Sequence, residues 1–421
     1  MSQTYPIFLD LFAGAGGLSE GFIRAGFRPI AHVESDQAAC YTLRTRMAYH
    51  WLKANGKTET YIDYLNGKLS REKFYSEIPG KVLDSILDKE IGSTTLPDIF
   101  SRIDMLLGKR RLDLIIGGPP CQAYSLVGRS RDENRMLGDK RNYLFFYYAQ
   151  FLKRYRPACF VFENVTGLLS AKDRQGKPYL SSMLDLFSEC GYQTEYKILS
   201  AEDYGVLQKR KRIILVGKLG KSSGFYPEPD TWHPDTDVSE IFSDLPFLRA
   251  GEGTLGSCRI RKYTGTWLNM AGIRNEEIPV TLHQARNNNP QDLEIYRIAV
   301  DLWNRKKQRL DYSALPIHLQ THNNKKSFLD RFKVVAGDLP YSQTVMAHIA
   351  KDGHYYIHPD IRQNRSITPR EAARLQTFPD DYYFESASDH AGRTSAFRQI
   401  GNAVPVLLAE KIANKLKETW Q

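Results

Sequence analysis

Two short motifs place reactive side chains directly after apolar segments. Cys121 follows the run LDLIIGGPP, and the two prolines before it restrict the backbone, so that the thiol projects from a rigid turn. Glu163 follows the apolar run ACFVF in the same way. A thiolate is a strong nucleophile at neutral pH when a cation or a general base supports it. A lone cysteine is usually a small buried residue, but a nucleophile and a carboxylate at neighbouring strand ends predict an active site.

A basic segment adds guanidinium groups to these candidates. Gln208, Arg210 and Arg212 alternate with two lysines directly before the apolar run at 213–217. Because the side chains of a strand point alternately to opposite faces, these three residues are predicted to share one face. A guanidinium held near the same sheet edge as the cysteine suits a carbonyl oxygen or a phosphate. We therefore predict catalytic roles for Arg210 and Arg212 as well.

A glycine-rich turn follows the first apolar run. The segment Asp10-Leu-Phe-Ala-Gly-Ala-Gly-Gly-Leu18 joins a strand-like run at 6–11 to a helical pattern at 18–26. Small residues allow a ligand to approach the backbone, and Glu34, after the second apolar run, is placed to bind ribose hydroxyls. The spacing is not GxGxxG, which argues against a pyrophosphate and favours a nucleoside-type ligand. The alternative is a tight glycine turn that binds nothing.

Alternating strand-like and helix-like segments position these motifs. Two helical patterns end at Pro157 and Gly191, because proline cannot continue a helix and glycine adopts the left-handed cap. The alternation predicts βαβ units and a doubly wound, mostly parallel α/β sheet, whose ligands bind at the carboxyl ends of the strands. The expected strands are 6–11, 28–33, 112–117, 158–162 and 213–217, and the expected helices are 18–26, 142–156, 178–190 and most of the last 20 residues.

The composition excludes several classes of protein. The 421 residues suffice for two or three domains at about 150 residues each, and an apolar share of 42 % is typical of a folded chain. No apolar stretch reaches the roughly 18 residues of a membrane span, and no signal peptide pattern is present, so a cytoplasmic protein is expected. The five cysteines are an odd number without CxxC spacing, which favours neither a disulfide framework nor a zinc site.

The charge distribution and the change in composition along the chain indicate its organisation. The net charge of +10 indicates a polyanionic partner, and residues 111–217, with 17 basic and 11 acidic side chains, carry +6 of it. Residues 40–110 are a polar insertion rich in Lys and Tyr, and Asp, Pro, Gly and Asn become frequent after about residue 220. We predict a catalytic domain at 1–220 plus 396–421 and a second, smaller domain at 221–395.

Seven sequence blocks, taken in order, make the chain similar to a known family. They are DLFAGAGGLSEGF, HVES, GGPPCQAYS, FVFENVTGL, QKRKRIILVG, RSITPREAARLQTFPDDYYF and QIGNAVP, and they span most of the chain. This ordered set resembles the DNA (cytosine-5)-methyltransferases of bacterial restriction–modification systems. The Pro-Pro-Cys tripeptide separates that family from the amino-methylating DNA enzymes, which have an Asn or Asp-Pro-Pro-aromatic turn there. The resemblance implies a Rossmann-like, S-adenosylmethionine-dependent methyltransferase domain and a DNA-recognition domain.

The resemblance also implies a reaction. The target cytosine is flipped out of the duplex into the pocket, where Cys121 attacks C6 of the ring. Glu163 hydrogen-bonds or protonates N3 and the edge with the exocyclic amine, and Arg212 holds O2. These contacts favour negative charge in the ring and make C5 nucleophilic. C5 takes the methyl group from S-adenosylmethionine, β-elimination frees Cys121, and S-adenosylhomocysteine is the second product.

The same resemblance assigns the cofactor contacts. The methionine end of S-adenosylmethionine is expected along the glycine turn, and Glu34 is expected to bind the ribose. Asp98-Ile99 resembles the segment that meets the adenine, and Asn402 is expected to close the site beside Gly16 and Gly17. The predicted cofactor set is Asp10, Phe12, Gly14, Gly16, Gly17, Leu18, Glu34, Asp98, Ile99, Pro119, Asn402 and Ala403, and no metal is expected.

Two further parts of the chain resemble DNA-contacting segments of the family. Residues 122–142 resemble the mobile loop that closes over DNA, which assigns phosphate contacts to its arginines. The segment between QKRKR and the TPRE block resembles the part that reads base edges, although a solvated loop is the alternative for any single residue. Within the TPRE block, Thr368-Pro369-x-Glu371 predicts a helix start. The predicted DNA contacts are Gln122, Ser125, Arg129, Arg131, Arg141, Gln208, Arg259, Arg261 and Arg286.

Three other functions are weighed against this one. An RNA (tRNA) cytosine-5 methyltransferase would keep the catalytic blocks, and only the long recognition segment argues against it. A dinucleotide-binding oxidoreductase is disfavoured by the missing GxGxxG spacing. A non-catalytic DNA-binding relative is disfavoured because all the catalytic candidates are present. The expected partners are double-stranded DNA and, by analogy, a separately encoded restriction endonuclease, and a monomer without membrane contact is expected.

Overall fold

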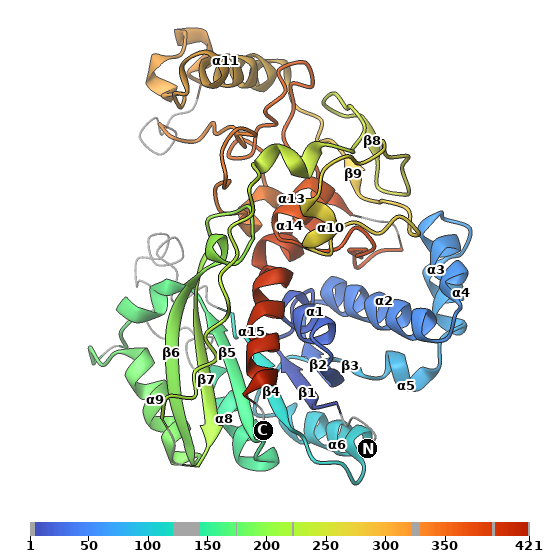
Figure 1. Ribbon diagram of the computed structural model, residues 1–421, viewed down its shortest axis with the longest axis vertical. Helices are drawn as coiled ribbons and strands as arrows, with labels where there is room; N and C mark the ends of the chain where they lie inside the picture. The colour runs from blue at the N-terminus through green and yellow to red at the C-terminus, as the bar shows by residue number, and fades with distance from the viewer. Residues whose placement is uncertain are drawn as a thin grey trace.

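A seven-stranded sheet forms the centre of the molecule (Figure 1). The computed structural model describes residues 5–120, 144–173, 175–220, 223–321, 329–389 and 392–419. The strand order is β3-β2-β1-β4-β5-β7-β6, and within this sheet β7 alone runs opposite to its neighbours. The predicted doubly wound, mostly parallel sheet is therefore confirmed. The strands are β1 (Ile7–Leu11), β2 (Arg28–Glu34), β3 (Ile86–Asp88), β4 (Leu114–Gly117), β5 (Cys159–Asn164), β6 (Tyr192–Ser200) and β7 (Lys211–Leu219).

Alternate residues of the central strands face two separate hydrophobic cores. Phe8 of β1 belongs to the core that includes helices α1 (Gly17–Arg24) and α15 (Val406–Glu418). Leu9, the next residue, belongs to the opposite core, which contains helices α6 (Leu96–Leu107), α8 (Leu144–Tyr155) and α9 (Tyr179–Glu189). This alternation follows from the period of two in a strand, and it buries both faces of the sheet, as parallel sheets require.

Two strands of the seven-stranded sheet, β3 and β6, were not predicted, and both lie at its edges. The short strands β8 (Gly253–Thr254) and β9 (His283–Gln284), which form a separate two-stranded sheet, were not predicted either. β6 has the sequence YQTEYKILS, and its side chains Tyr196 and Ile198 are exposed, because one face of an edge strand meets solvent. It therefore lacks the continuous apolar run that marks the buried strands. β3 has three residues, too few for a periodic pattern.

The predicted insertion contains regular parts of the fold. It includes β3 and most of α2 (Gln37–Ala54), as well as α6, so residues 40–110 are not an insertion throughout. The additional helices are α3 (Thr58–Leu65), α4 (Arg71–Ser76) and α5 (Gly80–Leu83). An aromatic-rich core joins α2, α3 and α4 to Ile278 from the later part of the chain. The additional helices are thus packed against a segment far along the chain.

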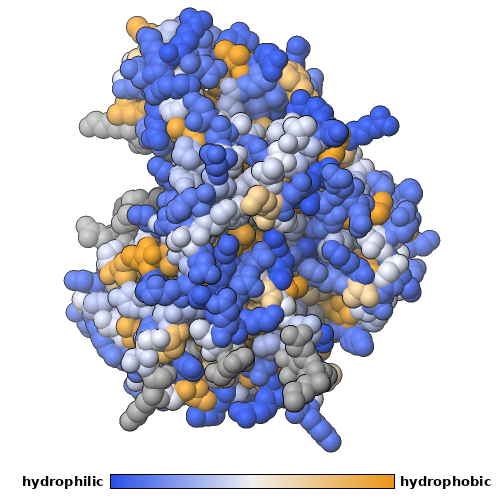
Figure 2. Space-filling model, viewed as in Figure 1, coloured by the Kyte–Doolittle hydropathy of each residue, from blue (hydrophilic) through white to orange (hydrophobic). Residues whose placement is uncertain are grey.

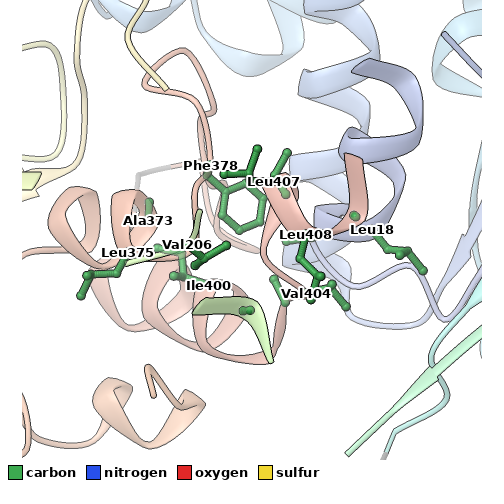
Figure 3. Close-up of a cluster of buried hydrophobic side chains, with 14 of the residues drawn as sticks. Leu18, Val206, Ala373, Leu375, Phe378, Ile400, Val404, Leu407 and Leu408 are labelled. Atoms are coloured by element: carbon green, nitrogen blue, oxygen red, sulfur yellow. The ribbon is translucent and has the colours of Figure 1, made fainter. Parts of the chain in front are cut away.

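The segment after residue 220 has few regular elements and packs on the sheet through its last helices. It contains α10 (Trp267–Met270), α11 (Pro290–Lys306), α13 (Pro369–Leu375) and α14 (Arg393–Asn402), with a small hydrophobic cluster of its own around α11, at the top of Figure 1. Figure 3 shows Leu375 of α13 and Ile400 of α14 in one cluster with residues of α1 and α15. The surface in the same view as Figure 1 is mostly hydrophilic, with scattered hydrophobic side chains (Figure 2).

The TPRE block begins a capped helix and carries buried ion pairs. The Thr368 side chain accepts a hydrogen bond from the Glu371 amide, and the Glu371 carboxylate accepts one from the Thr368 amide, so the predicted helix start is confirmed. Arg365 pairs with Glu371 at 2.7 Å, and Arg374 pairs with Asp244 at 2.5 Å and with a second aspartate, Asp380, at 2.7 Å. Buried charges need such partners, so these pairs fix how the segments of this region meet.

Candidate active site at the carboxyl edge of the sheet

The turn after β4 lies directly against Glu163. A Cβ atom added to Gly118 would lie 2.5 Å from the Glu163 Oε2 atom, so this position requires glycine. Pro119 is buried and Pro120, the last described residue before the cysteine, is exposed. Cys121 itself lies outside the described residues. The residues directly before the cysteine nevertheless lie beside the Glu163 carboxylate, because β4 and β5 are parallel neighbours.

Glu163 and Arg212 form an ion pair at this edge. The Arg212 Nε and Glu163 Oε1 atoms are 2.6 Å apart, and 12 % of the Arg212 side chain and 14 % of the Glu163 side chain are exposed. The antiparallel pairing of β5 with β7 brings the two residues together. Glu163 lies opposite Ile214, and Arg212 is two positions before Ile214, so it lies on the same face of the strand. A carboxylate beside a guanidinium offers an acceptor and donors in one small area. This pair suits a planar ring that carries an amine next to a carbonyl.

Arg210 and Gln208 face the protein interior instead. The Arg210 guanidinium donates to the carbonyls of Val345, Gly401 and Ala403 at 2.7, 3.1 and 2.8 Å. Gln208 is fully buried, and its amide nitrogen donates to the Leu375 carbonyl at 2.9 Å. The predicted alternation is confirmed, since both residues are buried and the two lysines are exposed.

Arg210 was predicted to be catalytic and Gln208 to contact DNA, but in the described structure both side chains bind other parts of the protein. The face that carries Arg210 and Gln208 is covered by the segments at 345 and 400–403, which the sequence pattern could not reveal. The Arg210 guanidinium binds the backbone of the QIGNAVP block, and the Gln208 side chain is fully buried in the described structure.

The glycine turn after β1 has an unusual backbone. Phe12, Gly14 and Gly16 have φ angles of 57°, 54° and 78°. A positive φ is rare for an aromatic residue, and such strain concentrates at ligand sites. The Gly14 amide donates to Glu34 Oε2 at 2.7 Å. The other carboxylate oxygen, Glu34 Oε1, accepts from the amides of Ser35 and Asp36. Glu34 therefore shapes the turn with one oxygen and the start of α2 with the other.

Asp10 supplies a buried carboxylate without a complete set of partners. Its side chain is 1 % exposed, and Oδ2 has no hydrogen-bond partner among the described residues. Burial first, and then the negative charge of Glu34, raise the pKa of Asp10 well above its ordinary value. Burying a carboxylate is unfavourable unless a partner is provided. Asp10 thus fits a ligand that carries a cationic group close to the glycine turn.

The QIGNAVP block closes this turn from the other side. A Cβ atom on Gly17 would lie 2.4 Å from the Val404 carbonyl oxygen and 3.1 Å from the Ala403 Cβ. Asn402, at the end of α14, is exposed. Ala403 and Val404 therefore contact Gly17, and the expected position of Asn402 beside Gly16 and Gly17 stays a prediction. Leu18 points into the hydrophobic cluster of Figure 3, so its role in the described structure is packing.

The predicted adenine segment is placed differently from the expectation. Asp98 lies in the first turn of α6 with its carboxylate 3.5 Å from Lys89 Nζ, and Ile99 is fully buried in the core under the sheet. Asp88, by contrast, ends β3 directly opposite Glu34. Asp88 was not among the predicted site residues, and the short apolar pair Ile86-Leu87 before it is the signal that marks its strand end.

The predicted DNA contacts are only partly described. Gln122, Ser125, Arg129, Arg131 and Arg141 lie outside the described residues. Arg259 and Arg261 are exposed, and the Arg261 guanidinium also donates to the Leu245 carbonyl at 2.5 Å. The Arg286 guanidinium donates to the carbonyls of Ile349, Ala350 and Lys351 and is therefore engaged within the protein.

Two kinds of feature are absent from the described part of the chain. It has no helix that is long and apolar enough to span a membrane. Within the same residues, His, Cys, Asp and Glu side chains form no group of three that could hold a metal ion.

Comparison with known proteins places this arrangement in context. A family model described as C-5 cytosine-specific DNA methylase matches residues 7–66 and 81–418. The chain is 41 % identical to the type II methyltransferase M.Bpa9945I of Bacillus paralicheniformis, over 98 % of each protein. It is 32 % identical to the type II methyltransferase M.XorII of Xanthomonas oryzae pv. oryzae, over 98 % of this chain and 85 % of that one.

The fold is also similar to a solved structure. A prophage-encoded protein of E. coli, considered a DNA modification methyltransferase, matches with a TM-score of 0.61 and 21 % identity, over 98 % of this chain and 99 % of that one. The similarity covers the whole fold and not only the sheet.

Proposed function

The chain belongs to the C-5 cytosine-specific DNA methylases, and we propose that it transfers a methyl group from S-adenosylmethionine to C5 of a flipped-out cytosine in a specific double-stranded DNA sequence. Its similarity to type II methyltransferases supports a role as the modification enzyme of a restriction–modification system. A separately encoded endonuclease and a monomeric state belong to the same proposal.

The ion pair of Glu163 and Arg212 beside the Gly118 turn carries the proposal. In it, Cys121 forms a bond to C6 of the cytosine, and the electron pair of the C5–C6 bond passes into the ring. Arg212 donates to O2 while Glu163 holds the N3 and amine edge, and both contacts stabilise the developing charge. C5 would take the methyl group from S-adenosylmethionine, with S-adenosylhomocysteine as the leaving group. A base such as water then takes the C5 proton, so that the C5–H electron pair re-forms the C5–C6 double bond while the C6–S bond breaks and releases the Cys121 thiolate. The 2.6 Å separation of the pair supports this division of roles.

The glycine turn is the proposed site of the cofactor. S-adenosylmethionine, when bound, supplies an electrophilic methyl group on a sulfonium. Asp10, with its buried and incompletely paired carboxylate, would hold a cationic part of this ligand. Phe12 and Gly14 would line the ligand with their strained backbone, and Glu34 would meet the ribose. Asp88, rather than Asp98, is the acidic residue beside Glu34, because it ends the neighbouring strand β3.

DNA recognition is proposed for the segment between the QKRKR strand and the TPRE block. Arg259 and Arg261 are the exposed candidates, and the arginines of 122–142 are proposed phosphate contacts.

Bisulfite sequencing of DNA from cells that express the chain tests the function. The expected result is protection of one cytosine in a short recurring sequence. Purified protein should also methylate duplex DNA and leave tRNA unmethylated when both are offered labelled S-adenosylmethionine in parallel. Methylation of tRNA alone would favour the RNA methyltransferase alternative, and no transfer to either nucleic acid would overturn the proposal.

A further inference from the structure

One side chain from the far end of the sequence reaches the glycine turn. The Tyr382 hydroxyl donates a hydrogen bond to the Ala15 carbonyl, although 367 positions separate the two residues. Tyr382 is 1 % exposed, and a Cβ atom on Gly16 would lie 2.9 Å from its hydroxyl oxygen. The tyrosine therefore contacts the turn at Ala15 and closely approaches Gly16.

A buried arginine fixes the position of Tyr382. The Arg46 guanidinium carbon lies 4.7 Å from the centre of the Tyr382 ring and 4.5 Å from the centre of the Tyr49 ring. The same guanidinium pairs with Glu20 of α1 at 2.5 Å and with Asp381 at 2.7 Å. Arg46 thus joins α1, α2 and the segment that carries Tyr382, and a desolvated cation between two rings is strongly attracted to both.

The additional helices hold the same segment from outside. The Tyr61 hydroxyl of α3 donates to the Asp381 carbonyl at 2.8 Å. The Tyr64 hydroxyl, also from α3, donates to Glu385 Oε1 at 2.6 Å. Arg71 at the start of α4 donates to the Ser386 carbonyl at 2.9 Å. Through these contacts, the helices α3 and α4 hold residues 381–386 in place.

The turn is then held from two sides. On one side Glu34 accepts from the Gly14 amide, and on the other Tyr382 donates to the Ala15 carbonyl. The positive φ angle of Phe12 is rarely adopted without such restraints, because a residue with a Cβ atom prefers other conformations. Loss of one restraint frees the turn to relax before the ligand binds.

We propose that Tyr382 is a positioning residue for the cofactor turn and that Arg46 and the helices α3 and α4 hold it in place. This inference rests on the proposed function, since it takes the turn to be the S-adenosylmethionine site. A ligand that needs the strained turn binds less tightly when the turn must first be ordered.

Calorimetric titration with S-adenosylhomocysteine tests the inference on the full chain. Tyr382→Phe keeps the ring and removes the hydroxyl, and we expect the dissociation constant to rise by about fivefold, which is the effect of one net hydrogen bond. The KM for S-adenosylmethionine should rise by a similar factor while kcat stays near the wild-type value. Tyr383→Phe is the matched control, because the neighbouring hydroxyl has no hydrogen bond among the described residues and its variant should bind as the wild type does.

Each result of the titration decides one question. Equal affinity of wild type and Tyr382→Phe overturns the inference, even if the variant melts at a lower temperature. A wild type that binds no S-adenosylhomocysteine overturns the cofactor assignment itself.

Amide hydrogen exchange on the wild type gives an answer that does not depend on the folding of a variant. S-adenosylhomocysteine should slow exchange in peptides that cover 12–20 and also in those that cover 379–386. Slower exchange in 12–20 alone would overturn the coupling of the two segments.

Discussion

Replacing Gly118 with alanine perturbs the candidate active site at a single atom. The new Cβ would lie 2.5 Å from the Glu163 Oε2 atom, whereas an unstrained contact needs about 3.5 Å. Either the carboxylate or the turn must therefore move by about 1 Å. The carboxylate cannot swing away freely, because its other oxygen is paired with Arg212 at 2.6 Å.

A shift of this size is expected to lower turnover strongly. Misplacement of a reacting group by about 1 Å costs on the order of 100-fold in rate, so kcat of Gly118→Ala should fall by about that factor. The turn that leads to Cys121 and the Glu163 carboxylate belong to the proposed pocket for the flipped cytosine. The cofactor turn is formed by other residues. The affinity for S-adenosylhomocysteine should therefore stay within about twofold of the wild-type value.

The assay is methyl transfer from labelled S-adenosylmethionine to duplex DNA under single-turnover conditions, together with calorimetric binding of S-adenosylhomocysteine. Gly80→Ala is the control, since its Cβ would meet its nearest atom, Asp84 Oδ2, at an ordinary 3.6 Å. Unchanged turnover of Gly118→Ala would refute the placement of Glu163 in the reaction, and an equal loss of cofactor binding would show that the two sites are not separate.

Three further predictions concern the nucleophile, the TPRE block, and His358, which is buried beside Glu371 of that block. Cys121→Ala and Cys121→Ser should abolish turnover and leave DNA binding intact in a gel-shift assay, and substantial methylation by either variant would contradict the nucleophile assignment. Thr368→Ala removes one half of the capping box, so the free energy of unfolding in urea should fall by about 1 kcal/mol, whereas an unchanged midpoint would mean that the cap adds no stability. Burial, and then the charge of Arg365, lower the pKa of His358 to about 3. Because the unfolded histidine binds its proton near pH 6.5, the stability should fall as the pH drops from about 6.5 toward 3, by up to about 1.4 kcal/mol per unit. His358→Gln should flatten this slope in denaturation series across that range, and an unchanged slope would assign the effect to other groups.

The strand-end positions of the chemistry were readable from the sequence. Glu163 follows an apolar run, and the carboxyl ends of parallel strands meet at one edge, so its place beside the turn that leads to Cys121 follows from local pattern alone. The capped start of α13 was equally local, because Thr368 and Glu371 satisfy each other within a single helical turn.

Tertiary structure decided which of two similar residues meets the site. Arg210 and Arg212 share one strand face, but the QIGNAVP block covers the first and leaves the second beside Glu163. The sheet likewise places Asp88 opposite Glu34 and Asp98 in the first turn of α6, and no local pattern predicted this difference. Periodicity assigns a side chain to a face, whereas the element that covers that face is set by packing between distant segments.

The contact of Tyr382 with Ala15 shows the same limit most clearly. No local signal joins residues at opposite ends of the chain, and only the buried cluster around Arg46 brings them together. The sequence alone determined the family blocks, the five central strands of the sheet and the strand-end position of Glu163. The packing of the long connections determined how the glycine turn is held, because that depends on side chains whose partners are hundreds of residues away.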